Sequence, residues 1–216
     1  MERINIGCGQ TPTAGWKNYD NSLSLRLARV PILPELLHNL RLLETPQYAF
    51  IEFCRKNKIA YGDATRGLPL ADSSCEVLYS SHMIEHLDRD EVTKFLNEAF
   101  RVLVPGGIIR IAAPDINIQV RKYAESGDAD AFIHGTRMCE PRPRSFAKRL
   151  RLLLVGTRNH QWMYDGNSLS QLLEKHGFVK AEVMPAGKTR IRDHQSLDLQ
   201  ERLSESVYVE AEKPNR

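Results

Sequence analysis

Two glycines follow the first apolar segment of the chain. Residues 3–6 predict a short strand, and Gly7-Cys8-Gly9 comes directly after it. Because glycine has no Cβ, the backbone of such a turn can approach a ligand closely, although a tight turn without a ligand has the same signature. Pro12 stands where the Gly-x-Gly-x-x-Gly pattern of dinucleotide-binding folds has its third glycine. The turn therefore favours a ligand without phosphates.

Two aspartates end the next two predicted strands. Asp20 follows residues 16–19, and Asp63 follows residues 58–61 after one glycine. An aspartate at the end of a strand is more often a turn or cap residue. Here Gly7, Asp20 and Asp63 follow three successive predicted strands, and the carboxyl ends of parallel strands meet at one edge of a sheet. We therefore expect Asp20 to meet ribose hydroxyls and Asp63 to lie near an adenine amino group.

The segment His82-Met83-Ile84-Glu85-His86 has the spacing of inverted zinc proteases, HxxEH. On one helix, the two histidines would share a face and could bind zinc, with Glu85 as a base. Such a site needs a third ligand, and no obvious candidate follows in the sequence. We therefore expect no metal here, and we expect His82 alone to face a ligand.

Strands and helices alternate along the chain, which predicts a parallel sheet. Residues 91–103 have a helical stripe of apolar residues, and residues 168–176 predict a short helix that ends before Gly177. A helical region is also predicted over 33–57, with a break near Thr45-Pro46. Further strands are expected at the following positions: 75–80, 108–113, 178–184 and 206–212.

In this order, the motifs resemble those of class I methyltransferases that use S-adenosylmethionine (SAM). The similarity covers roughly residues 3–115, with the C-terminal strand pair as a second match. It is carried by Ile4–Gly9, Gly62-Asp63-Ala64, Leu68–Asp72, Cys75–Leu87, Glu98–Gly107 and Ile111–Asp115. The resemblance implies an α/β fold with a Rossmann-like seven-stranded, mostly parallel sheet, an antiparallel C-terminal strand and helices on both faces.

The resemblance also implies roles for individual residues. The cofactor-binding residues would be Gly7, Cys8 and Gly9 at the methionine portion of SAM, Asp20 at its ribose, Asp63 and Ala64 at its adenine, and Ser80, Ser81 and His82 beside the methyl group. Only about ten residues separate Gly9 from Asp20, so the helix that usually follows the first strand must shrink to a turn. A SAM-binding regulatory protein without catalysis would share these features.

Two histidines are candidate catalytic residues. Transfer to an oxygen needs a base for the hydroxyl proton, and His82 is the better placed. His160 is the second candidate, in a cluster with Trp162, Tyr164 and Asp165 that would otherwise be a packed loop. We expect O-methylation of a small acceptor.

Basic residues are concentrated in residues 134–160, which hold seven arginines and lysines against one glutamate. Apolar residues at helical spacing, from Phe146 to Leu154, predict an amphipathic helix capped by Ser145. The segment would be a solvated face, a lid over an anionic or saccharide-like acceptor, or a weak peripheral membrane contact. Nucleic acid is less expected, because exposed aromatic residues do not alternate with the basic ones.

The composition is that of an ordinary globular protein. The chain has 216 residues, 42% hydrophobic, with a formal net charge of +3. No apolar run is long enough to span a membrane, and the four cysteines lack paired spacing. We therefore expect one cytoplasmic methyltransferase domain over 1–216, with residues 21–57 and 126–165 as cap or lid insertions.

Overall fold

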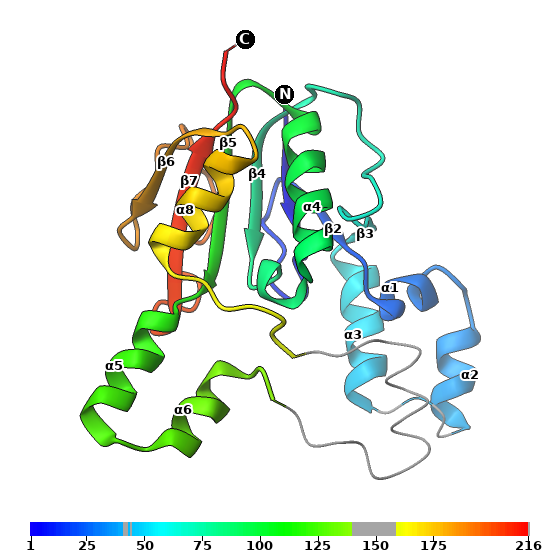
Figure 1. Cartoon of the computed structure of the whole chain (residues 1–216). Helices are drawn as coiled ribbons and strands as arrows, with labels where there is room; N and C mark the ends of the chain where they lie inside the picture. The colour runs from blue at the N-terminus through cyan, green and yellow to red at the C-terminus, as the bar shows by residue number, and fades with distance from the viewer. Residues whose placement is uncertain (41–42, 44, 140–158, 216) are drawn as a thin grey trace.

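A single seven-stranded sheet organises the chain (Figure 1). The computed structural model describes residues 1–40, 43, 45–139 and 159–215. The strands lie in the order β3-β2-β1-β4-β5-β7-β6, and β7 alone runs antiparallel to its neighbours. Their bounds are Glu2–Ile6 (β1), Lys17–Asp20 (β2), Ala60–Tyr61 (β3), Cys75–Ser81 (β4), Leu103–Pro114 (β5), Val179–Met184 (β6) and Ser206–Glu212 (β7). The predicted Rossmann-like sheet with its antiparallel C-terminal strand is confirmed.

The helices lie between the strands in sequence. They span Leu23–Ala28 (α1), Leu33–Asn39 (α2), Thr45–Lys56 (α3), Ile84–His86 (η1, a 3-10 turn), Arg89–Val102 (α4), Ile116–Ser126 (α5), Ala129–Thr136 (α6) and Gly166–Lys175 (α8). The predicted break near Thr45-Pro46 is present, because α3 begins at Thr45 after α2 has ended. The amphipathic helix predicted around residues 145–154 lies outside the described residues.

Helices α4 and α8 cover one face of the sheet (Figure 1). Alternate residues of β1, β4, β5 and β7 point toward them, as a pleated strand requires. In α4, a capping box between Asp88 and Glu91 satisfies the first turn, and the predicted apolar stripe is buried. Phe95, Leu96 and Ala99 have no exposed surface. This face holds the main hydrophobic core.

The opposite face is covered by Trp16 and by the β6–β7 connection. Ile191 and Leu197 of this connection pack against Tyr79 of β4 and against Tyr208 of β7. Its carboxylate Glu201 accepts hydrogen bonds from the Tyr79 hydroxyl at 2.8 Å and from the Thr11 hydroxyl at 3.0 Å. Hydrogen bonds to Glu201 thus hold this irregular connection against the sheet, whereas a helix would pack through an apolar stripe.

A buried ion pair fixes this connection to the sheet. Arg110 and Glu210 are direct partners in the β5–β7 ladder, and neither side chain is exposed. The guanidinium donates to Glu210 at 2.7 Å and to the carbonyls of Lys188 and Leu199. Glu210 in turn accepts from the backbone N–H of Arg190 at 2.8 Å. The Glu210 carboxylate and both terminal nitrogens of Arg110 are therefore hydrogen-bonded, whereas among the described residues the buried Nε of Arg110 has no partner.

Two helical groups lie beyond the carboxyl ends of the central strands (Figure 1). The first group, α1 to α3, packs through Leu25 and Cys54 against Cys8 and Ile59. The second is the α5–α6 hairpin, which begins directly after β5. Among the described helices, none has the length and apolar character needed to cross a membrane.

Replacing Arg110 tests the buried pair. We expect Arg110→Met to lower the free energy of unfolding by about 3–5 kcal/mol, because the buried Glu210 carboxylate loses its hydrogen-bonded cation and, among the described residues, keeps only that of Arg190, whose Nε is 3.6 Å away. Lys180→Met is a matched control, since Lys180 pairs with Glu212 on the neighbouring strands but is 65% exposed. Lys180→Met should lower the free energy of unfolding by less than about 1 kcal/mol. Urea denaturation measures both variants, and equal losses would contradict this view of the pair.

Candidate active site

The glycine turn at the end of β1 is held by backbone hydrogen bonds. The amides of Gly7 and Cys8 both donate to the carbonyl of Tyr19, at 2.8 and 3.1 Å. Gly7 and Gly9 adopt φ of +70° and +49°, in the left-handed region that favours glycine. The amides of this turn therefore bond within the protein, and what the turn offers a ligand is close backbone approach.

Cys8 lies between the two glycines and is buried. Burial, and to a lesser degree the nearby charge of Asp20, raises the pKa of its thiol well above the ordinary range. The neutral thiol packs with Leu25 and Cys54 under the turn. Cys8 is therefore placed as an apolar support of the turn.

Asp20 ends β2 and lies beside the glycine turn, as predicted. One carboxylate oxygen accepts from the amide of Gly9 at 3.1 Å, and the other accepts from the amide of Ser22 at 2.8 Å. A carboxylate has about four acceptor positions, so two remain for ligand hydroxyls. Asp20 thus joins the two strand ends and keeps two acceptor positions.

Asp63 lies two residues beyond β3, and the amide of Gly62 donates to the carbonyl of Asp20 at 3.1 Å. Its carboxylate accepts from the amide and hydroxyl of Thr65, at 3.0 and 2.6 Å, and so stabilises its own turn. Ala64 is buried in the main core. The structure therefore brings Asp63 and Ala64 to the same edge as Asp20.

The end of β4 carries the third group of predicted residues. Ser80 and Ser81 are buried, and Ser80 pairs in the sheet with Ile6, directly before the glycine turn. His82 follows with φ +48°, and its amide donates to the carbonyl of Ala112 at 2.9 Å. This bend ends the strand, so the HxxEH segment does not form the single helix that the protease interpretation required.

His82 has one hydrogen-bonded ring nitrogen and one ring nitrogen that faces a carboxylate. Nε2 lies 2.7 Å from the hydroxyl of Ser206, which itself donates toward the carbonyls of Glu201 and Arg202. Ser206 therefore accepts from Nε2, and the Nδ1 lone pair faces Glu85 Oε1 at 3.5 Å. Burial, followed by the charge of Arg202, lowers the pKa of His82 to about 3. His82 is thus a neutral imidazole.

Glu85, His86 and His160 form a second cluster next to His82. The rings of His86 and His160 meet edge to face, with centroids 5.2 Å apart. Burial lowers the pKa of His160 to about 4, and the neighbouring His86 adds to this effect. Burial raises the pKa of the Glu85 carboxyl to about 7. The two predicted catalytic histidines, His82 and His160, therefore belong to one polar site.

Met83 connects this polar site to the glycine turn. A Cβ built on Gly7 would lie 2.6 Å from Cγ of Met83, so the two residues are in direct contact. Met83, Ser206 and the burial of Glu85 were not predicted from the sequence. The HxxEH spacing was a signal for Glu85, whereas Ser206 lies 124 residues from His82 and has no local signal.

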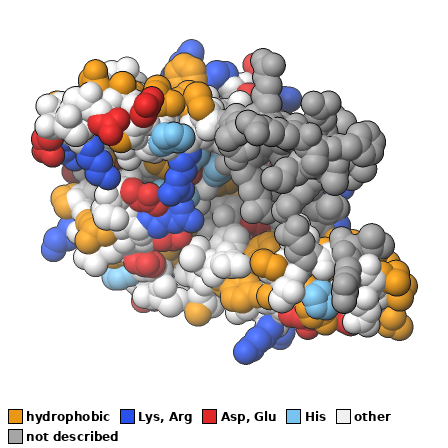
Figure 2. Space-filling model, turned by 90° about the horizontal axis from the view of Figure 1, so that it is seen from below, with side chains coloured by type: hydrophobic (Ala, Val, Ile, Leu, Met, Phe, Trp, Pro, Cys, Tyr) orange, Lys and Arg blue, Asp and Glu red, His pale blue; other side chains and the backbone are white. Residues whose placement is uncertain are grey.

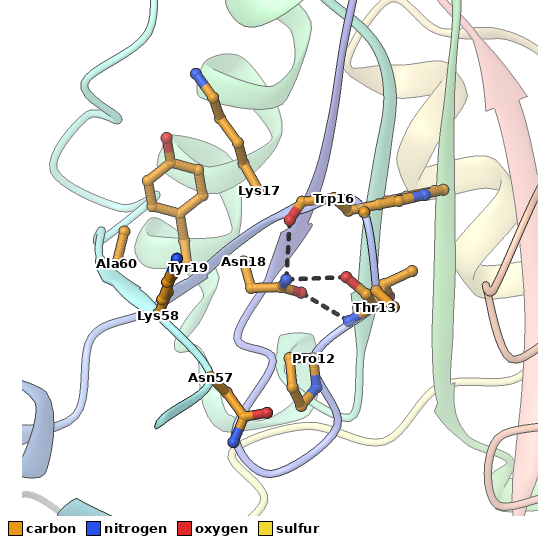
Figure 3. A pocket seen from close by; sticks show the side chains of 11 residues that line it. Pro12, Thr13, Trp16, Lys17, Asn18, Tyr19, Asn57, Lys58 and Ala60 are labelled. Carbon is orange, nitrogen blue, oxygen red and sulfur yellow. Dashed lines mark hydrogen bonds between the residues drawn. The ribbon is translucent and has the colours of Figure 1, made fainter. Parts of the chain in front are cut away.

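A cavity of about 530 Å³ lies elsewhere (Figure 3). It is lined by residues 12–19 with Asn57, Lys58 and Ala60, and it does not include Gly7, Asp20 or Asp63. Figure 3 shows the Asn18 side chain bonded to the backbone of Thr13 and Trp16, as the 2.7 to 3.0 Å distances require. The cavity therefore follows the β1–β2 connection and is separate from the site formed by Gly7, Asp20 and Asp63.

Most of the predicted basic segment, residues 140–158, lies outside the described residues. Arg137 is described, and it lies 3.8 Å from a carboxylate oxygen of Glu205. Figure 2 looks onto the carboxyl edge of the sheet and shows basic, acidic and histidine side chains gathered together there. The site is therefore polar and of mixed charge.

A comparison with protein families gives a match to this chain. The family model described as a methyltransferase domain matches residues 4–111, half of the chain, from β1 into β5. The chain belongs to this family. It is a SAM-dependent methyltransferase, with the β1, β2 and β4 ends inside the matched region. A comparison with curated proteins gives no significant match.

Solved methyltransferases share the fold. A SAM-dependent methyltransferase from Methanosarcina mazei is 15% identical, with a TM-score of 0.54, covering 100% of this chain and 93% of that one. A SAM-dependent methyltransferase from Thermotoga maritima, named a possible histamine N-methyltransferase, is 18% identical. Its TM-score is 0.52, over 98% of this chain and 82% of that one. At these identities the similarity concerns the fold alone.

The contact between Gly7 and Met83 can be tested with two alanine variants. Gly9→Ala carries only the cost of a left-handed alanine, about 1–2 kcal/mol, because nothing lies within 4 Å of its added Cβ. Gly7→Ala carries a similar cost and also displaces Met83, so we expect it to lower the free energy of unfolding further. Urea denaturation of both variants measures the difference. A smaller loss for Gly7→Ala would contradict the contact.

Proposed function

We propose that this methyltransferase binds SAM across the ends of β1, β2 and β3 and methylates an oxygen of a small, anionic or saccharide-like acceptor. The contact between Met83 and Gly7 carries the proposal, because it places the His82 segment directly over the glycine turn. A methyl donor on the turn would therefore lie beside a neutral imidazole. Gly7, Cys8 and Gly9 would line the methionine portion, with Ser80 and Ser81 beneath the sulfonium.

Asp20, Asp63 and Ala64 would hold the nucleoside. Asp20 has acceptor positions left after its bonds to the amides of Gly9 and Ser22, so it suits the ribose hydroxyls. Asp63 and Ala64 follow the neighbouring strand and suit the adenine. Since these groups are already fixed by the protein's own hydrogen bonds, little ordering is needed when the cofactor binds.

In the chemical step His82 would be the base, and the Glu85 carboxylate, 3.5 Å from Nδ1, would stabilise the imidazolium against the burial that lowers the pKa of His82. The acceptor hydroxyl would lose its proton to Nδ1 of His82, and its oxygen would attack the methyl carbon of SAM. The carbon–sulfur bond breaks, its electron pair stays on sulfur, and S-adenosylhomocysteine is the product. In-line positioning of donor and acceptor supplies much of the rate, and His160 would help to orient the acceptor from the adjoining cluster.

Two arginines support an anionic acceptor. Arg137, just after α6, and Arg202, in the β6–β7 connection, both face Glu205 and both act on the charge state of His82. Their side chains are 61% and 48% exposed, so a ligand can reach them. The insertions 21–57 and 126–165 would form a cap around this opening, since their described helices lie beyond the strand ends (Figure 1).

Cofactor binding gives the first test. SAM and S-adenosylhomocysteine should raise the melting temperature of the protein, and Asp20→Ala and Asp63→Ala should each weaken SAM binding by about 1–3 kcal/mol, because each removes a partner from a buried polar group. Asp90→Ala, an exposed residue in the first turn of α4, is the control and should leave SAM affinity unchanged. Unchanged affinity in both site variants would show that the carboxylates are misassigned.

Turnover separates an enzyme from a regulatory SAM-binding protein. With labelled SAM and pools of hydroxyl-bearing acceptors, we expect methyl transfer that falls by about 10²–10⁴-fold in His82→Ala, the range for loss of a general base. SAM affinity should change far less. Equal losses of turnover and affinity would make His82 a binding residue, and a wild-type protein that binds SAM without transfer to any pool would favour the regulatory alternative.

A further inference from the structure

A carboxylate and two histidines converge on one point beside the methyl-transfer site. One ligand atom each from Glu85, His86 and His160 lies within 4.8 Å of the other two. Glu85 is 1% exposed and His160 is 6% exposed, while the His86 side chain is 37% exposed. The cluster is therefore built from the interior and opens toward solvent on the His86 side.

The Glu85 carboxylate is the unusual member of this cluster. Among the described residues, neither of its oxygens has a hydrogen-bond partner, although both are buried. A buried carboxylate without hydrogen bonds is costly unless a proton or a cation compensates it. Burial raises the pKa of the Glu85 carboxyl for the same reason, because the charged form loses its hydration. The Glu85 carboxylate therefore favours a positive charge beside its two oxygens.

Ring nitrogens of two neighbouring imidazoles lie close to the same carboxylate. Nδ1 of His86 donates to the carbonyl of Asn159 at 3.2 Å, and Nε2 of the same ring lies 3.8 Å from Glu85 Oε1. The Nδ1 lone pair of His82 faces the same oxygen at 3.5 Å. Acceptor atoms that face one another repel, and a cation between them turns this repulsion into attraction.

The backbone holds the three ligands in place. The carbonyl of Glu85 accepts from the amides of Gln161 and Trp162, at 2.6 and 3.2 Å, and the amide of His160 donates to the carbonyl of Arg137 at 3.1 Å. These bonds fasten the segment that carries His160 to both η1 and the end of α6. The bond from His86 to a backbone carbonyl is the kind that orients histidine ligands in metal sites.

We propose that Glu85, His86 and His160 bind one divalent transition-metal ion of the zinc type. Two imidazoles and one carboxylate form a donor set that zinc uses in catalytic sites, where a further position stays open for a ligand. Such nitrogen-rich sets suit zinc-like ions better than magnesium or calcium. The sequence-based expectation of no metal depended on a missing third ligand, and the structure supplies His160 in that position.

The charges around the cluster permit a cation. Arg137 and Arg202 approach it, but both lie within 4 Å of Glu205. Both arginines therefore pair with Glu205, which leaves the Glu85 carboxylate for the ion. If the proposed methyl transfer is correct, the open position would hold the acceptor oxygen and polarise it, with His82 adjacent to take its proton.

Cobalt titration tests the proposal directly. We expect metal-stripped wild-type protein without SAM to bind one equivalent of Co²⁺, with the visible absorption of nitrogen and oxygen coordination, and to release it when Zn²⁺ is added. Glu85→Gln and His160→Ala should each weaken Co²⁺ binding by more than about 100-fold, since removal of a supporting residue alone costs 10–100-fold. Circular dichroism shows whether each variant is folded. If His160→Ala is unfolded, the Co²⁺ affinity of Glu85→Gln alone tests the proposal.

Two controls make the result specific. His176→Ala removes an imidazole that caps α8, away from the cluster, and should leave Co²⁺ affinity unchanged. Cys139→Ser removes an exposed thiol that could bind cobalt by itself. No binding by wild-type protein, equal binding by the Glu85 and His160 variants, or binding that is lost with Cys139 would overturn the proposal. SAM affinity is measured separately, so Co²⁺ binding without SAM binding would refute the proposed function alone, and the reverse would refute the metal site alone.

Discussion

The structure depends on the short connection between β1 and β2. Parallel neighbours usually need a dozen or more residues and a helix to return the chain, but only ten residues separate Ile6 from Lys17. Side-chain amides replace the helix: Asn5 donates to the carbonyl of Thr11, and Asn18 bonds both polar groups of the Thr13 backbone. Because none of the described helices covers the second sheet face here, Trp16 and the β6–β7 connection cover it.

Carboxylates fasten the parts that lack regular structure. Asp20 ties the β1 turn to the start of α1, Glu201 ties the β6–β7 connection to β4, and Glu210 ties the same connection to β5 through Arg110. In each case the partner amides, hydroxyls or guanidinium satisfy the charge. Glu85 differs, because its two oxygens have no such partners among the described residues. That contrast separates a structural carboxylate from one that is available for chemistry.

The sequence predicted what depends on local periodicity. The apolar stripe of α4 and the ordered strand ends at Gly7, Asp20 and Asp63 were readable because their signals lie within a few residues. Helices α5 and α6 were missed, since α5 buries no residue and so has no stripe to detect. The meeting of Glu85 with His160 depends on backbone hydrogen bonds between segments about 75 residues apart, and the covering role of the β6–β7 connection depends on scattered polar anchors. Neither the contact between Glu85 and His160 nor this covering role produces a pattern within a short stretch of sequence.

The contact between Met83 and Gly7 has a thermodynamic consequence. Met83 touches the glycine turn on one side and stands two residues from Glu85 on the other. A ligand that displaces Met83 from the turn would therefore also act on the polar cluster, and a ligand in the cluster would act on the turn. Such coupling is reciprocal, since each ligand must change the affinity for the other by the same factor. The size of the residue at position 83 would then set how strongly donor and acceptor occupancy depend on each other.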